Sequence, residues 1–116
     1  MTTKKQFDVF IKECDRYIDI FGLSEYFVLY QHVKIEKDEW QAGCTVDFEG
    51  LNAIISLSND VVLTDYEIMA AAKHEILELL LAKLDKIMKA RTVTEAEIVE
   101  ERHKVINRLL RVKITK

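Results

Sequence analysis

The chain has 116 residues, of which 49% are hydrophobic and 32% are charged; this composition is typical of one soluble globular domain, and the chain is too short for a second hydrophobic core. The formal net charge of −3 provides no overall positive field, so we expect no nucleic-acid binding. No apolar run approaches the roughly 20 residues that span a membrane and the first residues carry no export signal, so the sequence predicts a cytoplasmic protein without membrane contact.

Residues 4–21 are predicted to form the first helix. Its apolar residues recur every three or four positions and share one face, and they are Phe7, Phe10, Ile11, Cys14, Ile18 and Phe21. Thr3 and Gln6 fit a capping box at the start, and Gly22 is suited to end the helix in a left-handed conformation. Cys14 and the later Cys44 are expected to be reduced core thiols, because they are not spaced as a metal-binding pair.

The next three stretches alternate apolar and polar residues, as half-buried strands do. Their expected inward side chains are Phe27, Leu29, Val33 and Ile35, then Trp40, Ala42, Cys44, Val46 and Phe48, then Leu51, Ala53, Ile55 and Leu57. Short turns at 37–39 and 49–50 favour an antiparallel meander. His32 is expected to be exposed, whereas Tyr26, Tyr30 and Trp40 are favoured as core residues over an aromatic binding wall.

Two further helices are predicted from repeated start signals. Thr64 followed by Glu67 begins a long helix that runs to about Arg91, and Thr94 followed by Glu97 begins a C-terminal helix. The apolar face of this last helix consists of Ile98, Val99, Val105, Ile106, Leu109, Leu110 and Val112. The sequence therefore predicts an α+β fold with residues 1–116 in a single domain: a helix, a three-stranded and mainly antiparallel sheet, a long helix and a C-terminal helix.

The long helix carries a polar ridge. Projection at about 100° per residue places Glu67, His74, Glu78 and Asp85 within a band about 40° wide. His74 and Glu78 are four residues apart, so their side chains lie one above the other and can hold one metal ion. Glu75 can then polarise a metal-bound water as a catalytic base. The motif reads His-Glu-x-x-Glu, one residue different from the His-Glu-x-x-His signature of zinc metallopeptidases.

Beyond this pentapeptide, the order of elements resembles that of the minimal zincin-like domains encoded by many phages and prophages. The matching residues are 27–30 in the aromatic strand, Asp47, 53–57 in the apolar strand, 64–67 at the helix cap, and Ala71, His74 and Glu75. The resemblance covers nearly the whole chain and implies a zincin-like fold with a Zn²⁺ site. Because Glu78 stands where the family has its second metal-binding His, the resemblance implies a degenerate metallopeptidase-like protein with weak or no peptidase activity.

The resemblance also implies a third metal ligand from the last helix, where zincins of the glutamate type supply a Glu. Glu100 and Glu101 lie near the expected place. His103 interrupts the apolar stripe between Val99 and Ile106, which points it inward and ranks it first. The predicted site therefore consists of His74, Glu78 and either His103 or Glu101 as metal ligands, with Glu75 as the base.

Simpler interpretations remain open for these residues. His74 and Glu78 could be an i,i+4 polar pair on a solvated face, and His103 could be a core histidine hydrogen-bonded to a neighbour. Two functions therefore compete: an active metal-dependent hydrolase, or a non-catalytic phage-type protein that binds a protein or peptide. A hydrolase needs the polar ridge to meet the last helix in a metal-sized pocket. The sequence does not define the oligomeric state.

Overall fold

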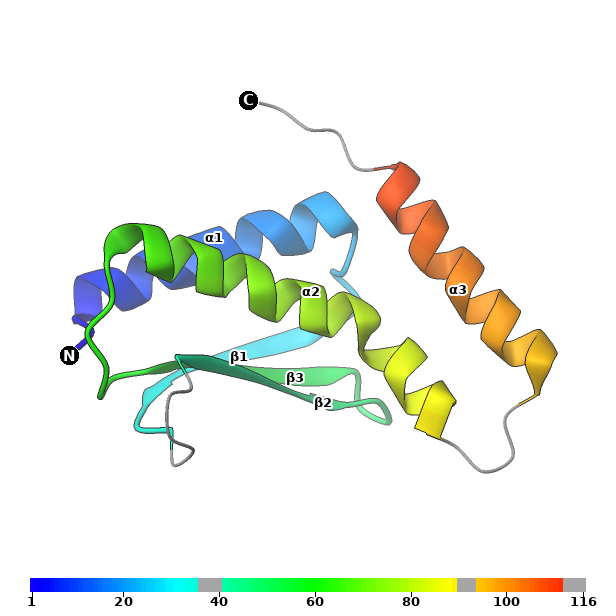
Figure 1. Ribbon diagram of the computed structural model, residues 1–116, viewed down its shortest axis with the longest axis horizontal. Coiled ribbons are helices and arrows are strands. Elements are labelled where there is room, and N and C mark those ends of the chain that lie inside the picture. Colours follow the sequence, from blue (N-terminus) through cyan, green and yellow to red (C-terminus); the bar gives the residue numbers. More distant parts are fainter. Residues whose placement is uncertain (36–40, 90–93, 112–116) are drawn as a thin grey trace.

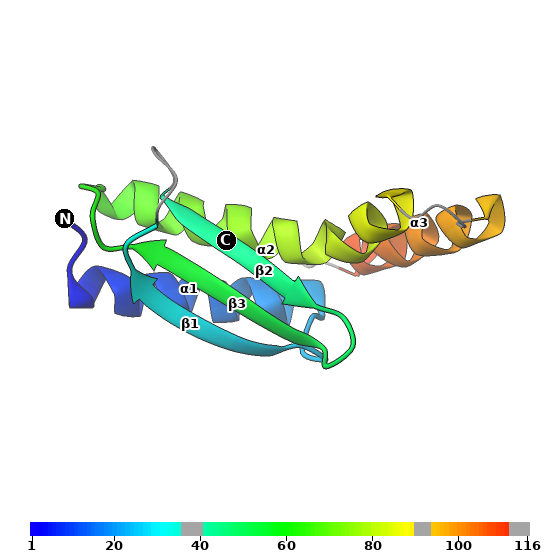
Figure 2. The same cartoon turned by 90° about the horizontal axis from the view of Figure 1, so that it is seen from below.

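The computed structural model describes residues 1–35, 41–89 and 94–111. Within these ranges the elements are α1 (Lys4–Phe21), β1 (Phe27–Val33), β2 (Ala42–Asp47), β3 (Asn52–Ser58), α2 (Asp65–Lys89) and α3 (Glu95–Leu110). Helices α1 and α2 pack on each other and lie over one face of the sheet, while α3 packs against α2 (Figure 1, Figure 2). The predicted α+β fold is confirmed. None of the described helices is long and apolar enough to cross a membrane.

Helix α1 begins and ends as predicted. Gln6 N donates to Thr3 Oγ1 at 3.1 Å and Thr3 N donates to Gln6 Oε1 at 3.0 Å, which completes the capping box. At the other end Gly22 adopts a φ of 67°, a left-handed conformation that costs glycine no steric strain. Between these ends Phe10 and Cys14 are fully buried in the core.

The sheet is mixed, with the strand order β1-β3-β2. β1 pairs in parallel with β3, as Tyr30 with Ile55, and β2 pairs in antiparallel with β3, as Cys44 with Ile55. The predicted antiparallel meander is therefore wrong, because β3 lies between β1 and β2. The physical reason is the composition of β3, whose Ala53 and Leu57 are at most 1% exposed. A strand this apolar is most stable in the middle, where both of its edges are hydrogen-bonded.

The inward face of β1 is the reverse of the predicted one. Phe27, Leu29 and Val33 lie on the open face of the sheet and are 71%, 50% and 39% exposed. Tyr30 instead packs against the core, and its hydroxyl donates to Asp15 Oδ1 on α1 at 2.6 Å. The alternation rule failed because β1 is apolar on both faces. An aromatic ring with a polar end can be buried once that end reaches a partner on the helix.

His32 connects the sheet to the N-terminus, so the prediction that it is exposed is wrong. Its ring stacks on Phe7 of α1 with centroids 4.8 Å apart. Its Nε2 lies 2.7 Å from Thr2 Oγ1, and the Thr2 hydroxyl donates to Ser58 O at 2.6 Å. Because that hydroxyl has one hydrogen, Thr2 Oγ1 accepts from His32 Nε2.

Among the other predicted inward residues, Ala42, Cys44 and Val46 pack against the core, whereas the prediction for Leu51 is wrong, because this residue is 43% exposed in the turn before β3. Tyr26 packs against the core. Cys14 is buried, Cys44 is partly buried, and both are free thiols. Trp40 and the predicted turn at 37–39 lie outside the described residues.

Helix α2 is buried along the side that faces α1 and the sheet. Its buried residues are Ile68, Ala71, Ala72, Glu75, Ile76, Leu79 and Leu80. Thr64 and Glu67 form the predicted cap, since Glu67 N donates to Thr64 Oγ1 at 3.2 Å and Thr64 N donates to Glu67 Oε1 at 2.9 Å. The helix reaches Lys89, and its predicted end near Arg91 lies outside the described residues.

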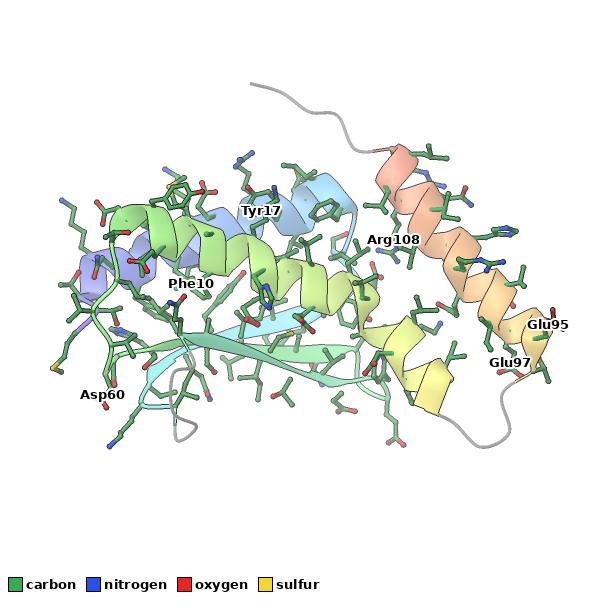
Figure 3. All side chains as sticks on the ribbon, viewed as in Figure 1. Phe10, Tyr17, Asp60, Glu95, Glu97 and Arg108 are labelled. Atoms are coloured by element: carbon green, nitrogen blue, oxygen red, sulfur yellow. The ribbon has the colours of Figure 1, made fainter. Side chains whose placement is uncertain are left out.

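Helix α3 is attached through polar contacts. Arg108 donates to Gly22 O at 2.8 Å and to Glu25 Oε1 at 2.6 Å, which joins α3 to the turn after α1 (Figure 3). The predicted cap at Thr94 is present. Much of the predicted apolar face is exposed, and Val112 of that face lies outside the described residues.

Candidate functional site

A cavity of about 390 Å³ lies between strand β2 and helix α2. It is lined by Gln41, Ala42, Gly43 and Cys44 from the strand side and by Ala71, His74, Glu75 and Glu78 from the helix. The three polar residues of the His-Glu-x-x-Glu motif therefore line one cavity. The opposite wall comes from the sheet rather than from the last helix, because β2 is an edge strand that packs against α2 (Figure 2).

The outer edge of β2 presents backbone hydrogen-bonding groups beside this cavity. Ser58 N donates to Gln41 O at 2.8 Å, which makes these two residues a hydrogen-bonded pair. Such pairs alternate along an antiparallel ladder, so Gly43 faces β3 whereas the backbone N–H and C=O groups of Ala42 and Cys44 point away from it. Within the described part of the chain, no strand pairs with this edge.

His74 and Glu78, the first two predicted metal ligands, are brought together. His74 Nε2 lies 3.4 Å from Glu78 Oε1, and the side chains are 69% and 60% exposed. A polar contact this exposed contributes only about 0–1 kcal/mol to stability. Both side chains are therefore available to a ligand at the cavity.

Glu75 is buried in the same cavity wall and is 5% exposed. Burial raises the pKa of its carboxyl above the ordinary value of 4.5, while nearby His74 lowers this pKa and Glu78 raises it by smaller amounts. Among the described residues, none donates a hydrogen bond to this carboxylate. Its oxygens keep some accessible surface, since among the described residues no fully buried side-chain oxygen lacks a partner, and that surface opens into the cavity. A largely buried acid without a protein donor is unusual for a residue with only a structural role.

The thiols near Glu75 are held in their protonated form. The pKa of Cys44 is raised to about 12, mainly by burial, and the charges of Glu75 and Glu78 make smaller contributions to this rise. Burial also raises the pKa of Cys14, with smaller contributions from Asp15 and Glu75. Neither thiol is therefore suited at neutral pH to act as a nucleophile.

The predicted ligands on the last helix are not brought to this cavity. Glu101 is 7% exposed, but it faces Lys83 Nζ at 3.1 Å and Lys104 Nζ at 3.0 Å. At 1.5 Å per residue, Lys83 lies about 13 Å further along α2 than His74. His103 is exposed, so the prediction that it points inward is wrong. The inward face of α3 carries Glu101, and a residue two positions later lies about 200° further round the helix.

Two lysines keep Glu101 ionised. Burial alone would raise the pKa of this carboxyl, but the hydrogen bonds from Lys104 and Lys83 lower it below the ordinary value of 4.5. The three side chains form an ion cluster that joins α3 to α2.

The donor set at the cavity does not complete a zinc site. In residues 1–35, 41–89 and 94–111, no three His, Cys, Asp or Glu side chains form a group that could hold a metal ion. A catalytic zinc ion has three protein ligands, and His74 with Glu78 supplies two. On the strand side, Cys44 is the cysteine among the described lining residues, and it does not form such a group with His74 and Glu78.

A second cavity of about 410 Å³ continues the first along the strand, and the two share Cys44 and Glu78. Its other lining residues are Val46, Phe48, Leu81, Ala82, Asp85 and Lys86. We name the two cavities together the β2–α2 groove. Sequence reasoning missed its strand wall, although the small residues at 42–44 are a signal for an open space beside a strand.

Comparisons of the chain with protein-family models, with curated proteins and with solved structures found no match. The resemblance to zincin-like domains therefore stays a prediction. Function has to be inferred from the chemistry of the groove.

Proposed function

We propose that this chain is a zincin-like domain of the phage type that binds an extended peptide in the β2–α2 groove, with weak or no peptidase activity. One observation carries the proposal: the groove runs beside an edge strand. The backbone groups of Ala42 and Cys44 point out of the sheet, so a peptide can pair with them as an added strand. Main-chain hydrogen bonds supply affinity in this mode, and the pockets beside the strand supply specificity.

The motif residues support the same location. His74, Glu75 and Glu78 lie on the helix wall, beside the path of a peptide paired with β2. In the family that the sequence resembles, residues at these positions hold the metal and activate water. Here Glu78 replaces the second His, and no third ligand joins the pair within the described residues. Binding with little or no cleavage follows from this combination.

An active metal-dependent hydrolase is the second candidate, and one observation favours it. Glu75 is buried next to His74 and Glu78, and the raised pKa of its carboxyl suits a general base. The number of ligands disfavours it, because a catalytic zinc ion needs three protein ligands and the described residues supply two, His74 and Glu78.

Peptide binding to a backbone variant tests the proposal. The probe is a fluorescein-labelled nine-residue peptide of alternating Thr and Val, whose affinity is measured by fluorescence anisotropy. Ala42→Pro removes an outward N–H without removing a bond to β3, so we expect roughly threefold to tenfold weaker binding. Ala42→Val, which keeps the N–H, is the matched control. Binding that is equal in both variants would show that the peptide does not pair with β2.

Metal content separates the two candidates. Protein purified without chelator or nickel resin is compared with His74→Ala, and both are incubated with the bound peptide. The proposal expects no stoichiometric zinc, no gain in thermal stability on adding zinc, and an intact peptide. About one equivalent of zinc that is lost in His74→Ala, together with cleavage that is lost in Glu75→Gln, would establish the hydrolase instead.

A further inference from the structure

Charge is distributed unevenly along the β2–α2 groove. The carboxylates that line it are those of Glu75, Glu78 and Asp85. Among the described side chains that line the groove, the ammonium is that of Lys86, whose Nζ lies 4.7 Å from the centroid of the Phe48 ring, at the end of the groove away from His74. The first cavity therefore presents two carboxylates and no lysine or arginine among its described lining residues.

One of these carboxylates, that of Glu75, is held at a defined place in the cavity wall. Its side chain is 5% exposed and lines the cavity, and no described residue donates a hydrogen bond to it. Its neighbour Glu78 carries a charge of the same sign. A ligand group that brings both positive charge and N–H donors relieves the repulsion and hydrogen-bonds to the Glu75 carboxylate together. Ammonium and guanidinium groups meet both conditions.

The continuation of the groove has a different character. Its second cavity is lined by the apolar side chains of Val46, Phe48, Leu81 and Ala82. Leu81 is 45% exposed, so its apolar surface is open to a ligand. An apolar side chain bound there gains roughly 25 cal/mol for each Å² of apolar surface that it removes from water.

The two cavities are spaced for neighbouring positions of one strand. Side chains on the same face of a strand are two residues, or about 7 Å, apart. On the helix wall, the midpoint between Glu75 and Glu78 of the first cavity lies about 7 Å before Leu81 of the second, at 1.5 Å per residue. A peptide paired with β2 therefore places consecutive inward side chains in consecutive cavities.

We infer that the β2–α2 groove selects an extended peptide with a lysine or arginine at one inward position and an apolar residue two positions away. The basic side chain lies between Glu75 and Glu78, and the apolar one lies against Leu81 and Val46. This inference rests on the proposed peptide binding, because pairing with β2 sets the two-residue spacing.

Matched peptides test the inference. Nine-residue fluorescein-labelled peptides carry Thr at outward positions and a Lys/Leu pair at neighbouring inward positions, in both orders along the chain. In two companions norleucine or Glu replaces the Lys, and in a third the Lys and Leu are three residues apart, on opposite faces. For one order we expect the Lys peptide to bind roughly tenfold more tightly than the norleucine peptide, and the Glu peptide to bind most weakly.

Charge variants of the protein locate the preference. Glu75→Gln combined with Glu78→Gln should remove the advantage of Lys over norleucine, and Glu78→Lys should reverse the order of the Lys and Glu peptides. Asp8→Asn, an exposed substitution on α1, is the control and should leave the advantage unchanged. A reversal of preference cannot arise from a folding defect alone.

The outcomes separate this inference from the proposed function. Equal binding of the Lys and norleucine peptides, still weakened by Ala42→Pro, would overturn the basic selectivity and leave peptide binding intact. Equal binding of the peptide with the three-residue spacing would overturn the strand geometry and indicate attraction by charge alone. If no peptide binds, the proposed function fails as well.

Discussion

Two buried glutamates, on different helices, differ in their electrostatic surroundings. Glu75 on α2 is 5% exposed and Glu101 on α3 is 7% exposed, yet the pKa of the first is raised and that of the second is lowered. Lys83 and Lys104 donate hydrogen bonds to Glu101, whereas no described residue donates one to Glu75. The difference teaches that the donors around a buried carboxyl, and not burial alone, determine the direction in which its pKa shifts.

Glu101 and Glu75 also have different roles. The Glu101 cluster connects α3 to α2, so it is a structural contact. Glu75 faces a cavity and reduces stability in the absence of a ligand, which is the pattern of a residue kept for binding or chemistry. Substitutions that remove only the charge can therefore test the comparison at both positions.

The largest effect is expected for Glu101→Gln, which leaves two ammonium groups without their shared carboxylate. We expect a loss of about 1–3 kcal/mol in the free energy of unfolding, at the lower end because Lys83 and Lys104 are 52% and 48% exposed. Urea denaturation at neutral pH measures it. Glu100→Gln removes a 67% exposed neighbour that pairs with Lys104 at 3.6 Å, and it should cost under about 0.5 kcal/mol. Equal losses of unfolding free energy in Glu101→Gln and Glu100→Gln would show that the burial of Glu101 does not strengthen its contacts with the lysines.

For Glu75→Gln we expect the free energy of unfolding to change in the opposite direction, towards higher stability. Removal of a buried charge that lacks a donor, with the shape of the side chain retained, should stabilise the protein by about 0.5–2 kcal/mol at neutral pH. Thermal unfolding should show the melting temperature raised by a few degrees. A lower melting temperature would mean that the Glu75 carboxylate makes a stabilising contact in solution, and the contrast with Glu101 would fail.

The third prediction concerns how the stability changes caused by Glu101→Gln and Glu75→Gln depend on pH. Because the pKa of Glu101 is lowered on folding, its stabilisation is present above 4.5 and is lost as the pH falls through its folded pKa. Because the pKa of Glu75 is raised on folding, its destabilisation appears as the pH rises from 4.5 through its folded pKa. Melting temperatures of both variants should therefore approach that of the native protein in acid and diverge in opposite directions towards neutral pH. If the melting temperatures of the two variants instead changed with pH in the same way, the opposite pKa shifts of Glu75 and Glu101 would be contradicted.

The smallest effect is expected for Arg108→Gln, which tests whether α3 depends on the Glu101 cluster alone. Loss of the contacts to Gly22 O and Glu25 should cost about 0.5–1 kcal/mol, since the Arg108 and Glu25 side chains are 29% and 38% exposed. Hydrogen exchange in α3 should accelerate while exchange in α1 stays unchanged. Arg102→Gln, at an exposed position of the same helix, is the control and should alter neither.

Local chemistry explains which parts of the fold could be predicted from the sequence. The caps at Thr3, Thr64 and Thr94 involve residues three positions apart, so each was visible as a short pattern. The order of the strands was not visible, because it depends on which strand the core covers most completely. The face of β1 was misassigned because Tyr30 and His32 find their partners on α1 and at the N-terminus.

The candidate site likewise has features that short sequence patterns predicted and features that they did not. The i,i+4 relation of His74 and Glu78 is local and was predicted correctly. His103 was chosen over Glu101 as the inward residue because it interrupts the apolar stripe between Val99 and Ile106, but much of that face is exposed in the structure. One of the two lysines that make burial of Glu101 tolerable, Lys83, comes from another helix, 18 positions earlier. The β2 wall depends on a tertiary contact between a strand and a helix, which no short pattern reports.

The central position of β3 has a consequence for how the chain folds. During synthesis β1 emerges well before the strand that it pairs with, since Gln31 meets Ser56 across a separation of 25 residues. The β2 and β3 hairpin can close locally, so we expect it to form first and to serve as the template onto which β1 adds. The contact of Thr2 with Ser58, 56 residues apart, then fastens the N-terminus to the completed sheet. Until β3 has left the ribosome, the apolar side chains of β1 have no partner strand, and this interval is when the nascent chain is most exposed to aggregation.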